Sequence, residues 1–83
     1  MEPQHLAIFL QQNFPGCDPQ LERGAPGERI GGYLIWEGFD GMEQIDRQSK
    51  LREVLRQLPR DQQLQVTVIL TVTPAEWTVM SEG

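Results

Sequence analysis

The sequence predicts a small α+β fold in which helices pack on one face of a three-stranded sheet. Three observations carry this prediction. A stripe of leucine and phenylalanine with helical period lies near the N-terminus, a run of alternating residues typical of a strand lies near the C-terminus, and a charged segment with helical spacing lies between them. The expected order is helix, strand, strand, helix, helix, strand, helix, within one domain spanning residues 1–83.

The first helix is predicted over residues 4–14. Pro3 suits the start of a helix, because the N–H that it lacks would have no partner there. The helix is expected to end around Asn13, since Pro15-Gly16 follows. Its apolar residues recur at i, i+3, i+4 and i+8 and therefore share one face; they are Leu6, Phe9, Leu10 and Phe14.

Two strands are expected next. A short one covers Gln20 to Arg23, and Gly24-Ala25-Pro26-Gly27 connects it to a clearer strand within residues 29–39. Gly31-Gly32 indicates a bulge or a close approach of two backbones. Apolar residues occupy both faces of the second strand, with Ile30, Leu34 and Trp36 on one side and Tyr33 and Ile35 on the other.

The stretch from Gly38 to Leu55 has apolar residues in two helical phases. Asp40 and Glu43 have the spacing of a capping box, which predicts a helix start immediately after Asp40. Two short helices joined by a bend near residues 46–50 would bury both phases, and the second would end near Leu58, before Pro59. At about 100° per residue, one phase points opposite to the other; the first contains Met42 and Ile45, and the second contains Leu51, Val54, Leu55 and Leu58.

Residues 63–73 predict the strongest strand, which should lie centrally or pack directly against the helices. The segment that follows predicts a helix start, with Thr73 as N-cap, Pro74 as first residue and Glu76 as capping-box partner. A short C-terminal helix bearing Trp77 and Met80 is expected there. The strand has one apolar face, Leu64, Val66, Val68, Leu70 and Val72, and a second face made of Gln65, Thr67, Thr71 and Thr73.

Composition excludes several classes of function. The formal net charge is −5, from 12 acidic and 7 basic residues, which argues against sequence-independent binding to nucleic acid. Most bases lie between Arg47 and Arg60, with acids among them, so a solvated and ion-paired helix face is expected. The lone Cys17 forms no intrachain disulfide and suits a reducing compartment. Neither a signal peptide nor a membrane-spanning apolar run is evident, so a soluble, acidic, cytoplasmic protein is expected.

Two segments resemble a known family. Phe39-Asp40-Gly41, followed by Arg47, Leu51 and Leu55, resembles the BolA-like pattern of a Phe-x-Gly before an Arg-His-Arg signature and a Val/Leu-spaced helix. Residues 73–77, TPAEW, resemble the Thr-Pro-Glu-Glu-Trp ending after the last BolA strand. The resemblance implies the class II KH-like layout, α-β-β-α-α-β. It also implies a protein partner such as a monothiol glutaredoxin, with which the family shares an iron–sulfur cluster.

The chain departs from the family where the cluster ligands would be. Gln48 and Ser49 follow Arg47 in place of the remaining His-Arg, and Gln65 falls about where the family has its histidine. An amide side chain does not replace the thiolate or imidazole that a cluster needs. We therefore expect no cofactor and no metal site in this chain.

The sequence is most typical of a small, non-enzymatic protein-interaction or regulatory module. Neither His5 nor Cys17 has a neighbour at catalytic or metal-ligand spacing. The alternative is a weak KH-type nucleic-acid-binding domain, because Gly38-Phe39-Asp40-Gly41 has GxxG spacing. Core packing is the expected role of Trp36 and Trp77, with an exposed Trp77 as the alternative. The candidate partner-binding residues are Arg47, Gln48, Lys50, Gln65 and Trp77.

Overall fold

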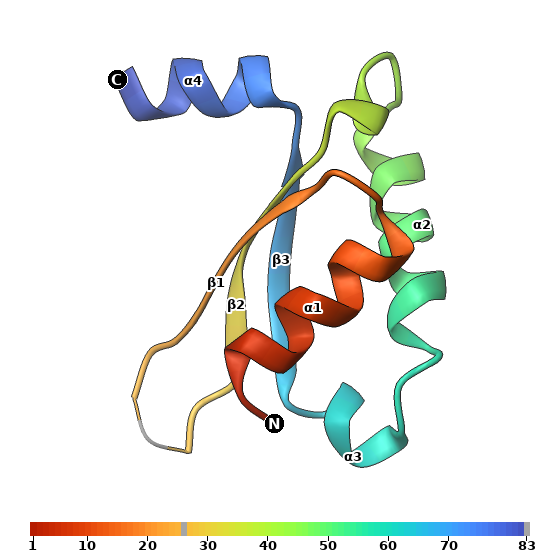
Figure 1. Cartoon of the computed structure of the whole chain (residues 1–83), viewed down its shortest axis with the longest axis vertical. Helices are drawn as coiled ribbons and strands as arrows, with labels where there is room; N and C mark the ends of the chain where they lie inside the picture. Colours follow the sequence, from red (N-terminus) through yellow and green to blue (C-terminus); the bar gives the residue numbers. More distant parts are fainter. Residues whose placement is uncertain (26, 83) are drawn as a thin grey trace.

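The computed structural model describes residues 1–25 and 27–82; Pro26, in the connection expected between the first two strands, lies outside the described residues. The observed order confirms the predicted α-β-β-α-α-β-α arrangement (Figure 1). The elements are α1 (Pro3–Asn13), β1 (Asp18–Arg23), β2 (Ile30–Ile35), the 3-10 turn η1 (Glu37–Phe39), α2 (Gln44–Leu55), α3 (Arg60–Gln63), β3 (Val66–Val72) and α4 (Pro74–Glu82).

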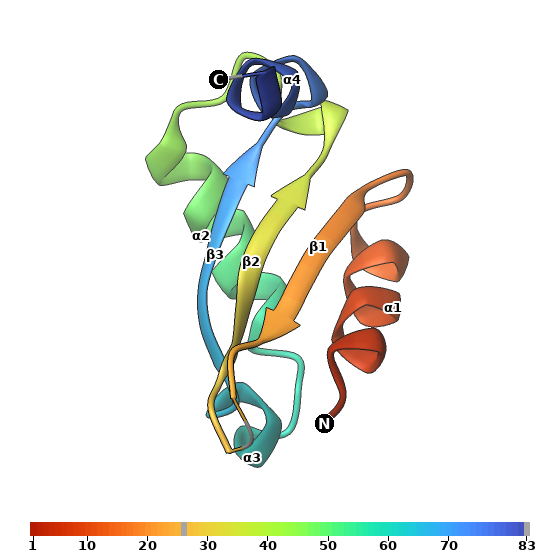
Figure 2. The ribbon, with the colours of Figure 1, turned by 90° about the vertical axis from the view of Figure 1, so that its left-hand side faces the viewer.

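The three strands form one mixed sheet in the order β1-β2-β3. β1 and β2 are antiparallel, whereas β2 and β3 are parallel, as expected for strands separated by a helical crossover. α1 and α2 lie on one face of the sheet, and α4 extends from its end on the other side (Figures 1 and 2). We call the face that α1 and α2 leave uncovered the open face.

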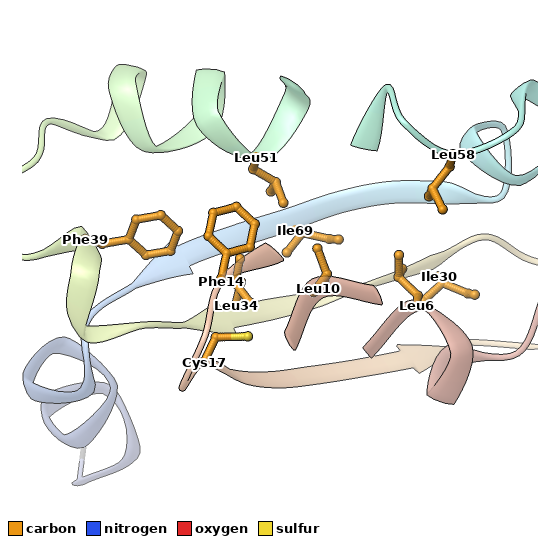
Figure 3. Close-up of a cluster of buried hydrophobic side chains, with 10 residues drawn as sticks. All are labelled: Leu6, Leu10, Phe14, Cys17, Ile30, Leu34, Phe39, Leu51, Leu58 and Ile69. Atoms are coloured by element: carbon orange, nitrogen blue, oxygen red, sulfur yellow. The ribbon is translucent and has the colours of Figure 1, made fainter. Parts of the chain in front are cut away.

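The core lies between the sheet and the two long helices (Figure 3). α1 contributes the predicted stripe, of which Leu6, Leu10 and Phe14 are fully buried. Phe14 meets Phe39 of η1 with ring centroids 5.9 Å apart. Ile30 and Leu34 point into the same cluster from β2, which confirms the face assigned to them from the sequence.

An irregularity is present at the glycine pair, but the extra residue lies in β3, where residues 67 and 68 face Gly31 of β2. The register between β2 and β3 shifts between Ile30 and Gly32. Gly32 has a φ of +143°, and a Cβ atom there would lie 2.0 Å from the carbonyl oxygen of Gln20 in β1. The close approach of the β1 backbone therefore requires glycine at this position.

The bend predicted near residues 46–50 is wrong. α2 runs unbroken from Gln44 to Leu55, and the chain breaks only at residues 56–59, before the single turn of α3. The conflict of apolar phases is resolved by exposure, because the side chain of Ile45 is 74% exposed. The predicted capping box at Asp40 is also wrong: α2 begins four residues later, and its N-cap Glu43 makes no side-chain capping bond.

β3 is an edge strand and not a central one, but it packs directly against α2 as the alternative prediction stated. Its apolar alternation is directed mainly away from the core. Ile69 and Thr71 face the helices and are buried, whereas Val68 and Leu70 lie on the open face and are exposed. A threonine face is buried here because α2 supplies partners for its polar atoms.

The capping box predicted at the last helix is confirmed. The backbone N–H of Thr73 donates to Oε1 of Glu76 at 2.8 Å, and the N–H of Glu76 donates to Oγ1 of Thr73 at 3.2 Å. α4 nevertheless contains no buried residue. Among the described residues, no helix is both long and apolar enough to cross a bilayer.

Candidate functional site

Arg47 occupies an internal position instead of the solvated helix face expected from the sequence. The residue is 5% exposed, and its guanidinium lies 5.9 Å from the ring centroid of Phe39. It donates through Nε to the carbonyl of Met42 at 3.0 Å and through Nη1 to that of Thr71 at 3.3 Å. Arg47 also forms an ion pair with Glu76 at 2.7 Å, and this is the single ion pair among the described residues.

The contact with Arg47 changes the pKa of Glu76. The hydrogen bond from Arg47 lowers the pKa of the Glu76 carboxyl, and the bond from the Thr73 amide lowers it further. The carboxylate thus holds the first turn of α4 and the middle of α2 at the same time. The two segments that carry the BolA resemblance, Arg47 and residues 73–77, are in contact here.

Gln48 and Gln44 saturate the outer edge of β3. Gln48 Nε2 donates to the carbonyl of Ile69 at 3.1 Å, and Gln44 Nε2 donates to that of Thr71 at 3.1 Å. The hydroxyl of Thr71 donates to Oε1 of Gln44 at 2.9 Å. An edge strand normally offers such carbonyls to another strand, so α2 blocks strand addition along this part of β3.

Two further candidates lie apart from this network. Gln65 accepts a bond from the amino group of Met1 at 2.8 Å, at the opposite end of β3 from α4. Lys50 is exposed, with its Nζ 5.8 Å from the ring centroid of Trp36. The structure therefore does not gather the five predicted residues into one surface. Their role as partner contacts stays a prediction.

The two tryptophans divide between core and surface. Trp36 packs edge-on against Phe14 and Phe39, each with centroids 5.1 Å apart, and its Nε1 donates to the carbonyl of Pro15 at 2.9 Å. Trp77 of α4 instead meets Tyr33 on the open face, with ring centroids 5.1 Å apart. Trp77 is half-buried and has no neighbour in the main core cluster.

The open face carries exposed apolar residues. Along β3 the exposed fraction rises with distance from α4, from 8% at Val72 through 46% at Leu70 to 65% at Val68. Leu70 pairs with Tyr33 in the neighbouring strand, so the two side chains are adjacent. We call Tyr33, Val68, Leu70 and Trp77 the apolar strip.

Val68 and Leu70 were missed as candidate functional residues. The signal was present, because the alternation of β3 assigned them to one face with Val66 and Val72. The pattern alone did not say which face the helices would cover.

The outer part of the open face is acidic. Asp18, Gln20 and Glu22 pair with Ile35, Tyr33 and Gly31, which places these three polar side chains on the open face along β1. All three are exposed. Charge and apolar surface thus lie side by side on the same sheet.

The described residues offer no ligand set for the iron–sulfur cluster that the resemblance implies. No group of three or more potential metal ligands occurs among residues 1–25 and 27–82. Cys17 is buried in the main core cluster, and burial, followed by the charge of Asp18, raises the pKa of its thiol. Gln65, where the resemblance would place the family's histidine, carries an amide. These donors do not fit a cluster.

Two hollows on the described part of the surface adjoin the elements of this region. One, about 380 Å³, lies beside the start of α4 and is lined by Glu37, Asp40 and residues 73–75. Another, about 270 Å³, lies between α2 and β3 and is lined mainly by Leu51, Leu55 and residues 67–69. Neither lining includes His5 or Cys17.

Comparisons of the chain with protein-family models, with curated proteins and with solved structures find no match. The BolA resemblance therefore depends on the residues described above and stays a prediction.

Proposed function

We propose that this chain is a small, non-enzymatic protein-interaction or regulatory module of BolA-like type that acts without iron–sulfur ligation. The observation that carries the proposal is the apolar strip. The core between the sheet and α1 and α2 is complete without it, yet Val68 and Leu70 remain exposed beside Tyr33 and Trp77. Apolar surface of this kind is typical of protein interfaces.

The aromatic residues support the proposal. Tryptophan and tyrosine are enriched among the residues that dominate binding energy. Trp77 and Tyr33 already contact each other edge-on, so neither ring needs to be ordered anew when a partner binds. The monothiol glutaredoxin implied by the resemblance is one such partner, in a contact that would not include a shared cluster.

Site-specific photocrosslinking tests the proposal. Leu70 is replaced by benzoylphenylalanine and the protein is irradiated in native cell extract, with the same replacement at Ile45 as a matched control on an exposed apolar site of α2. A protein crosslinked from Leu70 and not from Ile45 is then purified and titrated with the unmodified chain.

We expect direct binding that Leu70→Asp weakens by about tenfold or more, equivalent to about 1.4 kcal/mol. Equal crosslinking from both positions, or a purified partner that binds Leu70→Asp as tightly as the unmodified chain, would overturn the proposal.

A further inference from the structure

We propose that the open face and α4 together bind a basic amphipathic helix of a partner protein. This inference depends on the function proposed above and specifies the chemistry of the partner. Figure 1 shows α4 leaving the end of the sheet on the side opposite α1 and α2, and in Figure 2 α4 is seen end-on above the open face. The helix and the open face meet at a corner, where Trp77 of α4 contacts Tyr33 of β2.

α4 itself indicates that this corner is incomplete. The helix has nine residues, none of them buried, and its second half carries the exposed side chains of Val79 and Met80. Helices this short are marginal in water unless one face packs against something. Met80 follows Trp77 by three residues and so lies on the same side of the helix. A partner lying in the corner would therefore contact α4 and β3 together.

Charge defines the partner. Asp18 and Glu22 border the apolar strip on β1, and Glu82 lies in the last turn of α4. Most of the basic side chains lie in the helical layer or are engaged elsewhere. Arg23 donates to the backbone carbonyls of Glu28 and Met1. Lys50, Arg52, Arg56 and Arg60 belong to α2, α3 and their connection.

Arg29 is an exposed base that lies directly before β2, one of the strands of the open face. It precedes Ile30 at the start of β2, whereas α4 follows the end of β3, which is parallel to β2. Arg29 is therefore at the end of the sheet away from the corner, the end at which Glu22 pairs with Gly31, whereas Asp18 pairs with Ile35 at the end nearer the corner. Lysine and arginine side chains on a partner would complement the charges of Asp18, Glu22 and Glu82.

The same charges argue against a second copy of the chain as the occupant. A symmetric dimer through this face would bring the acids of β1 or α4 in one copy toward those of the other. Each copy also carries a net charge of −5. Like charges brought together across an interface disfavour that pairing.

Helical docking is favoured over strand addition. The outward carbonyls of Ile69 and Thr71 already accept bonds from Gln48, Gln44 and Arg47. A partner strand would have to break these bonds to pair with β3. A helix contacts the corner through side chains alone, with apolar residues at i, i+3, i+4 and i+7 on the apolar strip.

The test uses the full chain and two synthetic peptides. Both peptides are helical with leucine at positions a and d of each heptad; the first carries lysine at the flanking positions and the second carries glutamate. Binding is measured by fluorescence anisotropy, and the site by amide chemical shifts of the labelled chain. We expect the lysine peptide to bind at least tenfold more tightly than the glutamate peptide, with shifts concentrated at residues 68–72 and 74–82.

Two variants and two matched controls locate the site. Leu70→Gln should weaken binding of the lysine peptide about tenfold, whereas Ile45→Gln, an exposed apolar site on α2, should not. The double variant Asp18→Asn, Glu22→Gln should weaken binding several-fold at low salt and much less at high salt, because the screening length shortens. Asp46→Asn, an exposed acid of α2, should leave it unchanged.

Four results would overturn the inference. The first two are equal binding of both peptides and shifts confined to α2. The third is a chain that sediments as a dimer and becomes monomeric in Leu70→Gln. The fourth is single-stranded RNA that, added without peptide, shifts the amides of residues 68–72 and 74–82. The failure of this inference is distinct from failure of the proposed function. A partner crosslinked at Leu70 and reconstituted from purified components, together with no binding of the lysine peptide, would retain the function and reject the basic helix.

Discussion

Nη1 of Arg47 donates to Oε1 of Glu76 at 2.7 Å, and this contact joins the middle of α2 to the first turn of α4. The same carboxylate oxygen accepts the backbone N–H of Thr73 at 2.8 Å. The pair fixes the direction in which α4 leaves the sheet. The Arg47 side chain is buried, whereas the Glu76 side chain is partly exposed to solvent.

Replacing Glu76 by alanine should lower the free energy of unfolding by about 1–3 kcal/mol, because a charged hydrogen bond and a helix cap are lost together. Urea denaturation measures the change. Glu82→Ala, at the other end of α4, is the matched control and should stay within about 0.5 kcal/mol of the unmodified chain. If Arg47→Met and Glu76→Ala prove strictly additive in a double-mutant cycle, the pair does not couple the two helices.

Stability should depend on pH through Glu76. Its pKa in the folded chain lies below the ordinary carboxyl value of 4.5 because Arg47 donates to it. Between the folded and unfolded pKa values the unfolded chain binds more protons, so stability rises with pH there. The stability difference between the unmodified chain and Glu76→Gln should therefore be constant above the unfolded pKa and shrink as pH falls through the folded pKa. Urea midpoints across this range measure it, and a difference that grows on acidification would contradict the assignment.

The two apolar phases of α2 should differ in their cost of substitution. Ile45→Ala should change the free energy of unfolding by less than about 0.5 kcal/mol, because the side chain is exposed. Leu51→Ala should cost about 2–5 kcal/mol, because it leaves a cavity in the core. Thermal and urea denaturation of the two variants separate these cases. Comparable losses of unfolding free energy at both positions would contradict the straight helix and support one that bends to bury both phases.

Gly32→Ala should be more destabilising than Gly41→Ala. Both glycines have positive φ, which costs about 1–2 kcal/mol for another residue. Only at Gly32 would the new Cβ also clash with the backbone of β1; at Gly41 no atom lies within 4 Å. Equal losses of unfolding free energy, measured in urea, would show that β1 moves aside easily.

The Cys17 thiol should react slowly with an aromatic disulfide reagent in the native protein. Burial comes first among the causes that raise its pKa, so little thiolate is available and access is restricted. In denaturant the rate should rise to that of a free cysteine, which serves as the control. A native rate equal to the denatured rate would contradict a buried thiol.

The sequence by itself determined the features that depend on neighbours along the chain. The stripe of α1 follows from helical period, the start of α4 from the spacing of Thr73 and Glu76, and the close backbone approach at β2 from adjacent glycines. Each of these signals is local, so the backbone conformation follows from a few consecutive residues. The order of elements followed from these local signals.

Only the tertiary structure decided which surfaces are buried. α2 remains straight because Ile45 is left in water, and its inner side contains Arg47 and Gln48, polar residues that no apolar pattern would place there. Their partners, the backbone of β3 and Glu76, are distant in sequence. These bonds allow the Thr71 face of β3 to be buried and leave Val68 and Leu70 on the open face. Alternation defines two faces, but the element that packs against the strand selects the one that is buried.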